Sequence, residues 1–246
     1  MAVSKYEKEY EIRSYECDKN GDLRLLTLMN IFQDMADDHA ARLGLGLDFC
    51  RERGLAWVGS NYYLQINALP RLHDHIIVTT WPAVEKKLGA IRDFTVKNRE
   101  GKEIIRAVSQ WILINFEKKR PVSLRDNLPE YSIVQDRAIN ICDFAKLPDI
   151  TREDLKTSFK VRFDDIDINN HVNNAVYPLW ASESVGDDFR TQHRPREVEI
   201  AFKKEGHLGE NISVITELAA QTSLHSIRAE GDERELAKVK ILWQKL

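Results

Sequence analysis

The residues best suited to chemistry lie in one short segment, 164–174, which reads DDIDINNHVNN. In an extended backbone, side chains two positions apart share a face, so Asp167, Asn169 and His171 would project together. A carboxylate that accepts a hydrogen bond from one imidazole nitrogen fixes the tautomer and leaves the other nitrogen free to transfer a proton. The spacing favours an acid–base site, and it leaves equally open an Asx-rich turn that caps a helix while His171 is solvated.

Two further features could complete such a site. Glu205 stands between a strand-like run and the turn from Gly206 to Gly209, where an isolated carboxylate is more often a solvated turn residue. Apolar residues recur at helical spacing from Val172 onward, and the first amides of a helix can hold an oxyanion. The backbone N–H groups of Val172 and Asn173 are therefore candidate oxyanion donors.

The elements that must position these residues occur twice along the chain. In the first half, YEIRSYECD alternates like a strand, and apolar residues recur at helical spacing from Leu25 until Gly44. In the second half, FKVRF and a polar loop precede another helix pattern, which Pro178 should kink or delay. Matching strand-like runs follow each helix, and each half ends in a hairpin around a charged turn, NREGKE or EGDERE.

This order of elements favours an α+β fold of the tandem (double) hot-dog type, in which two antiparallel sheets each wrap around a central helix. An isolated hot-dog sheet leaves an exposed edge, so a duplication within one chain predicts an intrachain pseudo-dimer. We expect an N-terminal hot-dog domain at 1–130, a linker of little periodicity at 131–152 and a C-terminal hot-dog domain at 153–246. The alternative is a chance likeness between two generic α+β halves.

Composition excludes several classes of protein. The 246 residues are 43% hydrophobic and 30% charged, which is typical of a globular chain rather than a disordered or collagen-like one. A net charge of -3 argues against a broadly basic nucleic-acid surface, and three cysteines without a CxxC pair argue against a disulfide framework or a zinc knuckle. No apolar run could span a bilayer and the opening is too charged for a signal peptide, so we expect a cytoplasmic protein without stable membrane insertion.

The segment DIDINNHVNNAVYPLWASES resembles the signature of plant and bacterial acyl-ACP thioesterases, and EIAFKKEGHLG resembles the family strand that brings a glutamate to the same site. SYECDKNGDLRLLTLMNIFQDMADDHAARLG, GLAWVGSNYYLQINALPRL, TTWP and SQWILINFEKKRPVSL are similar to the family's amino-terminal domain. The resemblance implies a tandem hot-dog hydrolase that converts fatty acyl-[acyl carrier protein] to free fatty acid and acyl carrier protein (ACP), terminating fatty acid biosynthesis. It also implies no metal or organic cofactor, and a catalytic set of Asp167, Asn169, His171 and Glu205 in the C-terminal domain.

The chain departs from the family at one position. Plant members have a cysteine after the glutamate, where this chain has Gly206. A scheme with that cysteine as nucleophile or triad member cannot apply, so a carboxylate, an amide and an imidazole acting on water remain. The sequence leaves open whether Glu205 or His171 is the general base. The first-half loop CDKNGDLR has Asn20 and Arg24 where the second-half loop has its catalytic aspartate and histidine, so we expect one active site per chain.

The acyl chain needs an apolar tunnel, which we expect the N-terminal domain to provide as an acyl-chain pocket. An apolar stripe of Leu28, Phe32, Met35 and Ala36 on the first-half helix could line it. Phe32 and Trp57 are the candidate substrate-binding residues. Plain core packing explains each of these side chains equally well.

The expected partner is ACP, which is acidic, so a basic patch should dock it despite the negative total charge. The candidate basic residues are Lys86, Lys87, Lys118 to Arg120, Arg190, Arg194, Arg196, Lys203 and Lys204. The sequence leaves chain-length preference and a homodimer open. Rival functions are an acyl-CoA thioesterase, a hydratase or dehydratase on acyl thioesters, and a non-catalytic acyl-binding hot-dog protein; the intact set of four polar residues argues against the last.

Overall fold

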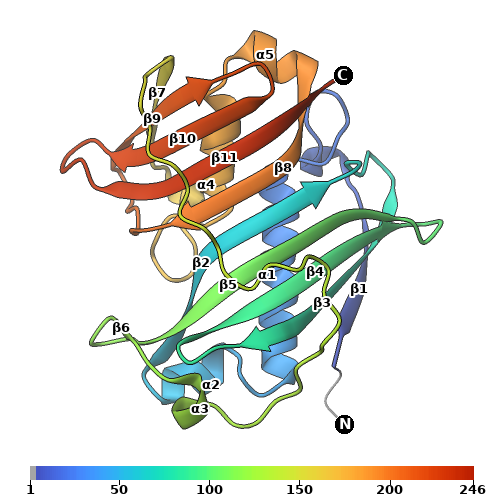
Figure 1. Ribbon diagram of the computed structural model, residues 1–246, viewed down its shortest axis with the longest axis vertical. Coiled ribbons are helices and arrows are strands. Elements are labelled where there is room, and N and C mark those ends of the chain that lie inside the picture. Colours follow the sequence, from blue (N-terminus) through green and yellow to red (C-terminus); the bar gives the residue numbers. More distant parts are fainter. Residues whose placement is uncertain (1–3) are drawn as a thin grey trace. The chain divides into compact units, whose positions relative to one another are not determined.

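In the computed structural model, which describes residues 4–246, the chain divides into two compact units, Met1–Phe144 and Ala145–Leu246 (Figure 1). The boundary lies within the segment 131–152. Across the described residues, no helix combines the length and the apolarity that a bilayer crossing requires.

The first unit is an antiparallel sheet packed against one long helix. Its elements are β1 (Tyr6–Glu11), η1 (Ser14–Glu16), α1 (Leu25–Arg42), α2 (Leu47–Glu52), β2 (Leu55–Ile66), β3 (His75–Glu85), β4 (Gly89–Asn98), β5 (Glu103–Asn115), β6 (Arg120–Pro121) and α3 (Leu124–Asn127). The strand order is β1-β3-β4-β5-β2, with every neighbour antiparallel and β6 paired with β5. The ring of Phe32 on α1 lies 4.7 Å from that of Phe94 on β4, so the core sits between helix and sheet.

Helix α1 confirms the helix predicted for the first half. Its apolar residues at three- and four-residue spacing are the ones that it buries, and Leu28, Phe32 and Met35 have no exposed surface. The helix stops at Gly44, whose φ of 75° is the left-handed conformation that glycine adopts without steric cost. The amide of Leu45 then donates to the carbonyl of Ala40 at 2.8 Å, which completes a Schellman cap.

The second unit repeats this architecture. Its elements are β7 (Leu155–Lys160), η2 (Phe163–Asp165), α4 (Val176–Glu183), α5 (Asp187–Gln192), β8 (His193–Phe202), β9 (Asn211–Leu218), β10 (Thr222–Ala229) and β11 (Glu235–Lys245). The strand order is β7-β9-β10-β11-β8, again antiparallel throughout. In both units the first strand therefore pairs with the third and the second strand with the fifth, which confirms the duplication and the hot-dog class of each half.

The strand predicted for YEIRSYECD ends earlier than expected, at Glu11. The carboxylate of Glu16 accepts a hydrogen bond from the amide of Arg13 at 2.7 Å, and this contact turns the chain into η1 and out of the sheet. The second unit uses the same device, because Asp165 accepts from the amide of Arg162 at 2.8 Å. The pattern Arg-x-x-acid thus marks the exit from the first strand of each unit.

The helix predicted from Val172 begins four residues later, at Val176. The side chain of Asn173 accepts from the amide of Ala175 at 2.9 Å, and its carbonyl accepts from the amide of Val176, so a turn comes before the helix. Pro178 is the third residue of α4. The amides of a first turn have no acceptor within the helix, so the missing N–H of proline removes no helical hydrogen bond there.

Two ion pairs tie the irregular segment that follows α3 to the units. Asp93 on β4 is fully buried, pairs with Arg137 at 2.9 Å and accepts from the amide of Ala138 at 2.7 Å. Lys238 on β11, whose side chain is also buried, pairs with Asp149. Charged contacts therefore attach this segment to each unit.

Candidate active site

The predicted catalytic string folds as a tight turn rather than an extended run. Ile166 and Val172 form an isolated bridge, and between them the amide of Asp167 donates to the carbonyl of His171 at 2.9 Å. The amide of Asn170 donates to the carbonyl of Asp167 at 3.0 Å, with φ of Asn170 at 65°. Asparagine tolerates this left-handed conformation. The expectation of one shared extended face is wrong, because these hydrogen bonds close the loop over five residues.

Asp167 organises the backbone of this turn. Its Oδ1 accepts from the amide of Asn169 at 2.8 Å, which is the Asx turn that the sequence left open as an alternative, and Asn169 Nδ2 lies 3.5 Å from Oδ2. The side chain of Asn169 stands exposed on the turn. Asp167 therefore shapes the turn and Asn169 lies exposed on it, while a different carboxylate contacts the imidazole of His171.

That carboxylate belongs to Glu205. His171 Nε2 lies 3.1 Å from Glu205 Oε2, with the side chains 29% and 45% exposed. Glu205 follows the end of β8, and its loop is joined to the turn because the amide of Val172 donates to the carbonyl of Gly206 at 2.9 Å. An imidazole and a carboxylate in contact and open to solvent can accept a proton and pass it on.

The two backbone groups predicted as oxyanion donors are already engaged. The amide of Val172 donates to Gly206, and that of Asn173 donates to the carbonyl of Asp165 at 2.8 Å. The prediction assumed that both amides belong to a helix N-terminus, whereas both precede α4 and form hydrogen bonds that stabilise the turn. We therefore drop Val172 and Asn173 as oxyanion donors.

Gly206 fits its place because there is no room for a side chain. A Cβ at this position would lie 2.9 Å from Cγ2 of Val172 and 3.3 Å from both Leu236 Cδ1 and the Tyr177 hydroxyl oxygen. The amide of Gly206 donates to that hydroxyl at 3.1 Å, and burial raises the pKa of Tyr177. The space that a cysteine would need is thus filled by the packing beneath the loop.

Sequence reasoning missed a second histidine at this site. The ring of His207 lies 5.3 Å from that of His171, centroid to centroid, at an interplanar angle of 64°. His207 is exposed and its amide donates to Glu210 Oε2 at 2.9 Å. The available signal was its position two residues after Glu205, on the same turn.

The corresponding turn of the first unit corrects the register assumed from the sequence. There the amide of Asp18 donates to the carbonyl of Asp22 at 2.8 Å, and Gly21, with φ of 78°, donates back to Asp18 at 3.0 Å. Asp18 therefore matches Asp167, Asn20 matches Asn169 and Asp22 matches His171. The assumed correspondence of Asn20 and Arg24 with aspartate and histidine is wrong by two residues, because the turns align through their backbone hydrogen bonds.

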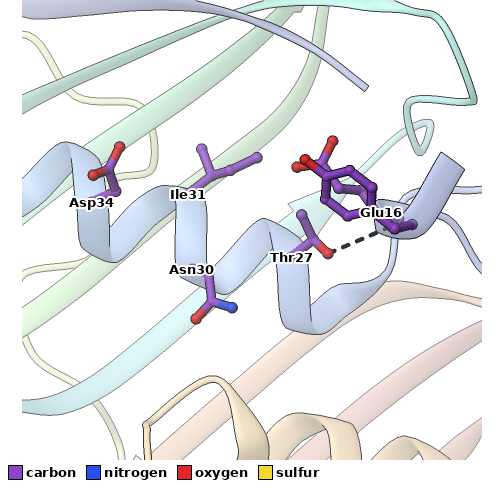
Figure 2. Close-up of a pocket in the computed structure, with 6 residues that line it drawn as sticks. Glu16, Thr27, Asn30, Ile31 and Asp34 are labelled. Atoms are coloured by element: carbon purple, nitrogen blue, oxygen red, sulfur yellow. Dashed lines mark hydrogen bonds between the residues drawn. The ribbon is translucent and has the colours of Figure 1, made fainter. Parts of the chain in front are cut away.

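The predicted substrate-binding residues lie in the first unit. Phe32 is fully buried, and Trp57 is half-buried against the core cluster of Cys50, Leu55, Leu113 and Leu124. An open pocket of about 370 Å³ lies along α1 and η1 and is lined by Tyr15, Glu16, Thr27, Asn30, Ile31 and Asp34. Figure 2 shows these lining residues. Neither predicted residue lines it, so their substrate contacts stay predictions.

Two of the candidate basic residues are engaged in ion pairs. Lys86 pairs with Asp143, and Lys203 pairs with Glu235. Lys204, next to the glutamate of the site, is exposed. Over residues 4–246, no three or more His, Cys, Asp or Glu side chains gather in an arrangement that could hold a metal ion.

Known proteins match this chain along nearly its whole length. Residues 3–131 match the model of the acyl-ACP thioesterase N-terminal domain, and residues 149–245 match that of the C-terminal domain. Oleoyl-acyl carrier protein thioesterase 1 of Arabidopsis thaliana is 23% identical over 98% of this chain and 76% of its own length. Acyl-[acyl-carrier-protein] hydrolase FATB3 of Cuphea viscosissima is 33% identical over 76% of this chain and 48% of its own length.

Solved structures share the fold. The 12:0-ACP thioesterase of Umbellularia californica superposes with a TM-score of 0.85 at 22% identity, covering 100% of this chain and 99% of its own. An acyl-ACP thioesterase of Bacteroides thetaiotaomicron gives a TM-score of 0.85 at 22% identity, with 98% of each chain covered. Since both domain models match in order and together cover most of the sequence, this chain belongs to the acyl-ACP thioesterase family.

Proposed function

We propose that this protein hydrolyses the thioester of fatty acyl-ACP, releasing free fatty acid and ACP and so ending chain elongation in fatty acid biosynthesis. The observation that carries the proposal is the partly exposed pair of His171 and Glu205, with atoms 3.1 Å apart, in the second unit of a family member. The chain spans 76% of the Arabidopsis relative and 48% of the Cuphea relative, both of which are named for acyl carrier protein substrates.

The pair supplies the proton transfers of the reaction. A water oxygen bonds to the thioester carbonyl carbon while one proton of that water passes to the His171–Glu205 pair. The carbon–sulfur bond then breaks, and the same proton goes to the departing thiolate to give the ACP thiol. Water is the only co-reactant, and one positioned proton acceptor of this kind is typically worth about 10² to 10⁴ in rate.

Charge that develops on the carbonyl oxygen needs a donor other than the two occupied amides. The exposed amide group of Asn169 lies on the same turn as His171 and can donate to this oxygen. Asp167 holds the turn in shape through the amide of Asn169, 2.8 Å from its carboxylate oxygen. The four polar residues thus divide into a proton-transfer pair, a carbonyl donor and a residue that shapes the turn.

The protein distinguishes acyl-ACP from acyl-CoA through contacts with the surface of the carrier protein, because the thioester chemistry is the same for both substrates. An acidic carrier gains encounter rate from exposed lysines such as Lys204, and salt screens such charges over about 8 to 10 Å. A cytoplasmic location and acyl-pocket roles for Phe32 and Trp57 belong to the same proposal; the Arabidopsis and Cuphea relatives are named as chloroplastic.

The test measures thiol release from matched acyl-ACP and acyl-CoA substrates, with Glu205→Gln as the inactive reference. We expect a higher kcat/KM on acyl-ACP, which falls with added salt and in Lys204→Glu. Equal turnover of both substrates without salt dependence would move the protein to the acyl-CoA thioesterases. Binding of acyl groups with no thiol release from either substrate would leave a non-catalytic acyl-binding protein.

A further inference from the structure

His207 is an aromatic neighbour of the proposed proton-transfer pair. Its ring meets that of His171 at 5.3 Å and 64°, which is the edge-to-face geometry that aromatic pairs prefer. The same His171 imidazole touches Glu205 through Nε2 at 3.1 Å. His171 is therefore held by two side chains of one loop, residues 203–210.

That loop is fixed on its own unit. The amide of His207 donates to Glu210 Oε2 at 2.9 Å, and Glu210 forms an ion pair with Arg234. Arg234 Nη2 also lies 3.4 Å from the carbonyl oxygen of Glu205, so a single guanidinium contacts the loop at Glu205 and at Glu210. Glu205 and His207 consequently keep a fixed spacing as they approach His171.

The first unit has a side-chain contact at the position that corresponds to His207 and His171. The amide of Leu23 donates to the carbonyl of Pro70 at 2.8 Å, as Val172 does to Gly206, so Arg71 occupies the place of His207. Arg71 Nε lies 3.5 Å from Oδ1 of Asp22, the residue that matches His171. In both units, the side chain after this bridge therefore contacts the same position of the turn. The contact is an ion pair between Arg71 and Asp22 in the first unit and a ring pair between His207 and His171 in the second.

We propose that His207 is a positioning residue, whose ring holds the imidazole of His171 in line with Glu205. The inference rests on the proposed function for its consequence in catalysis, but His207 itself lies outside the four residues assigned above. Without the ring, His171 loses this edge-to-face contact and can turn away from the carboxylate. Because His207 acts through His171, its loss should lower kcat and leave KM nearly unchanged.

The experiment compares His207→Ala, His207→Phe and Leu208→Ala, the last being a neighbouring exposed side chain. An aromatic pair of this geometry corresponds to about a two- to tenfold effect, so kcat of His207→Ala on acyl-ACP should fall by that factor, with KM within about twofold. The phenyl ring of His207→Phe should restore at least half of the lost rate, and Leu208→Ala should match wild type. An unchanged rate in His207→Ala, or an equal loss in His207→Phe, overturns the proposal.

A second measurement keeps this test separate from that of the proposed function. Side-chain ¹⁵N NMR of His171 reports its hydrogen bonding and ring mobility without any substrate. We expect the His171 signals to shift or broaden in His207→Ala and to stay unchanged in Leu208→Ala. If wild type hydrolyses no acyl thioester, the proposed function fails while these spectra still decide the contact; identical His171 signals in His207→Ala refute it.

Discussion

The turns that follow β1 and β7 have the same backbone and share an aspartate and an asparagine, but they differ at the residue that ends the turn, Asp22 in one and His171 in the other. In each, an aspartate amide and a left-handed residue close the loop, and a bridge then joins it to a second loop: Leu23 to Pro70 at 2.8 Å, and Val172 to Gly206 at 2.9 Å. Backbone hydrogen bonds and the shared aspartate shape such a turn, provided that one residue accepts a positive φ. The other side chains of the turn are consequently free to diverge.

The side chains that differ suit the first turn to a structural role and the second turn to proton transfer. In the first unit Asp22 is 2% exposed and lies 3.5 Å from Arg71, while Leu69 stands where the second unit has its glutamate. In the second unit His171 and Glu205 are partly exposed and in contact. A sealed carboxylate beside an arginine stabilises a turn, whereas an open imidazole and carboxylate can exchange protons. The duplication therefore gives a frame in which one copy can be perturbed and the other used as the control.

The largest effect should come from the proton-transfer pair. His171→Ala and Glu205→Gln should each lower kcat on acyl-ACP by about 100-fold or more, since each removes half of the pair. His73→Ala, which removes a histidine that is 76% exposed in the first unit, should keep the wild-type rate. Thiol release at saturating substrate measures all three. Near-wild-type turnover in both site variants, with unchanged circular dichroism, would place the chemistry elsewhere.

The next effect concerns Gly206, which matches Pro70 in the first unit. A side chain here meets Cγ2 of Val172 at 2.9 Å, so Gly206→Ala and Gly206→Cys should lower the free energy of unfolding by about 1 to 3 kcal/mol, as overpacking does. Val172→Ala should recover much of that loss in the double variant. Urea unfolding measures the cycle. Full stability of Gly206→Cys would show that the loop has room for the thiol.

The polar groups inside the two sheets differ as sharply as the two turns. Thr80 pairs with Phe94 in the register of the first unit, as Thr216 pairs with His225 in the second. His225 is fully buried, with its ring nitrogens 2.8 Å from the Thr216 hydroxyl and 2.7 Å from that of Ser223. Burial lowers the pKa of His225 to about 3, so the folded protein holds it neutral.

This difference predicts acid sensitivity that arises in the second unit. The pKa of an unfolded histidine is about 6.5, so below that pH this side chain is protonated in the unfolded chain while His225 stays neutral in the folded protein. The free energy of unfolding should therefore fall by about 1.4 kcal/mol per pH unit, or about 2 kcal/mol between pH 6.5 and pH 5. His225→Gln should be less stable at neutral pH but lose less on acidification, as urea unfolding at pH 7.5 and 5.0 can show. Parallel losses in both proteins would assign the acid sensitivity to other groups.

Periodicity was a good guide where burial decides the structure. The stripe that includes Leu28, Phe32 and Met35 predicted α1, and the repeated strand-like runs predicted that both units have the same sequence of elements, a strand, a helix and further antiparallel strands. These features are encoded by many residues at once, so no single polar contact can change them. The residues of the site could be recognised as a set, since Asp167, Asn169 and His171 stand together in the sequence.

Local hydrogen bonds decided what periodicity could not. Glu16 captures the amide of Arg13 and ends β1, and Asn173 forms a turn that delays α4. The pairing of His171 with Glu205 rather than Asp167 depends on a bridge between loops 34 residues apart, which no spacing reveals. His207 escaped notice for the same reason, because its ring reaches the site only through that bridge.

The smallest effect, and the finest test of the comparison, uses the aspartate that each turn shares. Asp18 Oδ1 accepts from the amides of Asn20 at 2.8 Å and Asp22 at 3.2 Å, and Asp167 Oδ1 accepts from that of Asn169 at 2.8 Å. Asp167→Ala should cost about 1 kcal/mol of unfolding free energy, the usual net value of one such hydrogen bond, and Asp18→Ala should cost about 1 to 2 kcal/mol because it removes two.

The activities of the two variants should differ in the opposite sense to their stabilities. Asp167→Ala loosens the turn that carries His171 and the carbonyl donor, so kcat should fall by roughly tenfold, because small misplacements of catalytic groups are costly. Asp18→Ala loosens a turn without an imidazole and should keep the wild-type kcat. Urea unfolding and thiol release on the same two preparations make the comparison. An equal loss of activity in both variants would mean that the first-unit turn also serves the reaction, and that the duplicated copy is more than a scaffold.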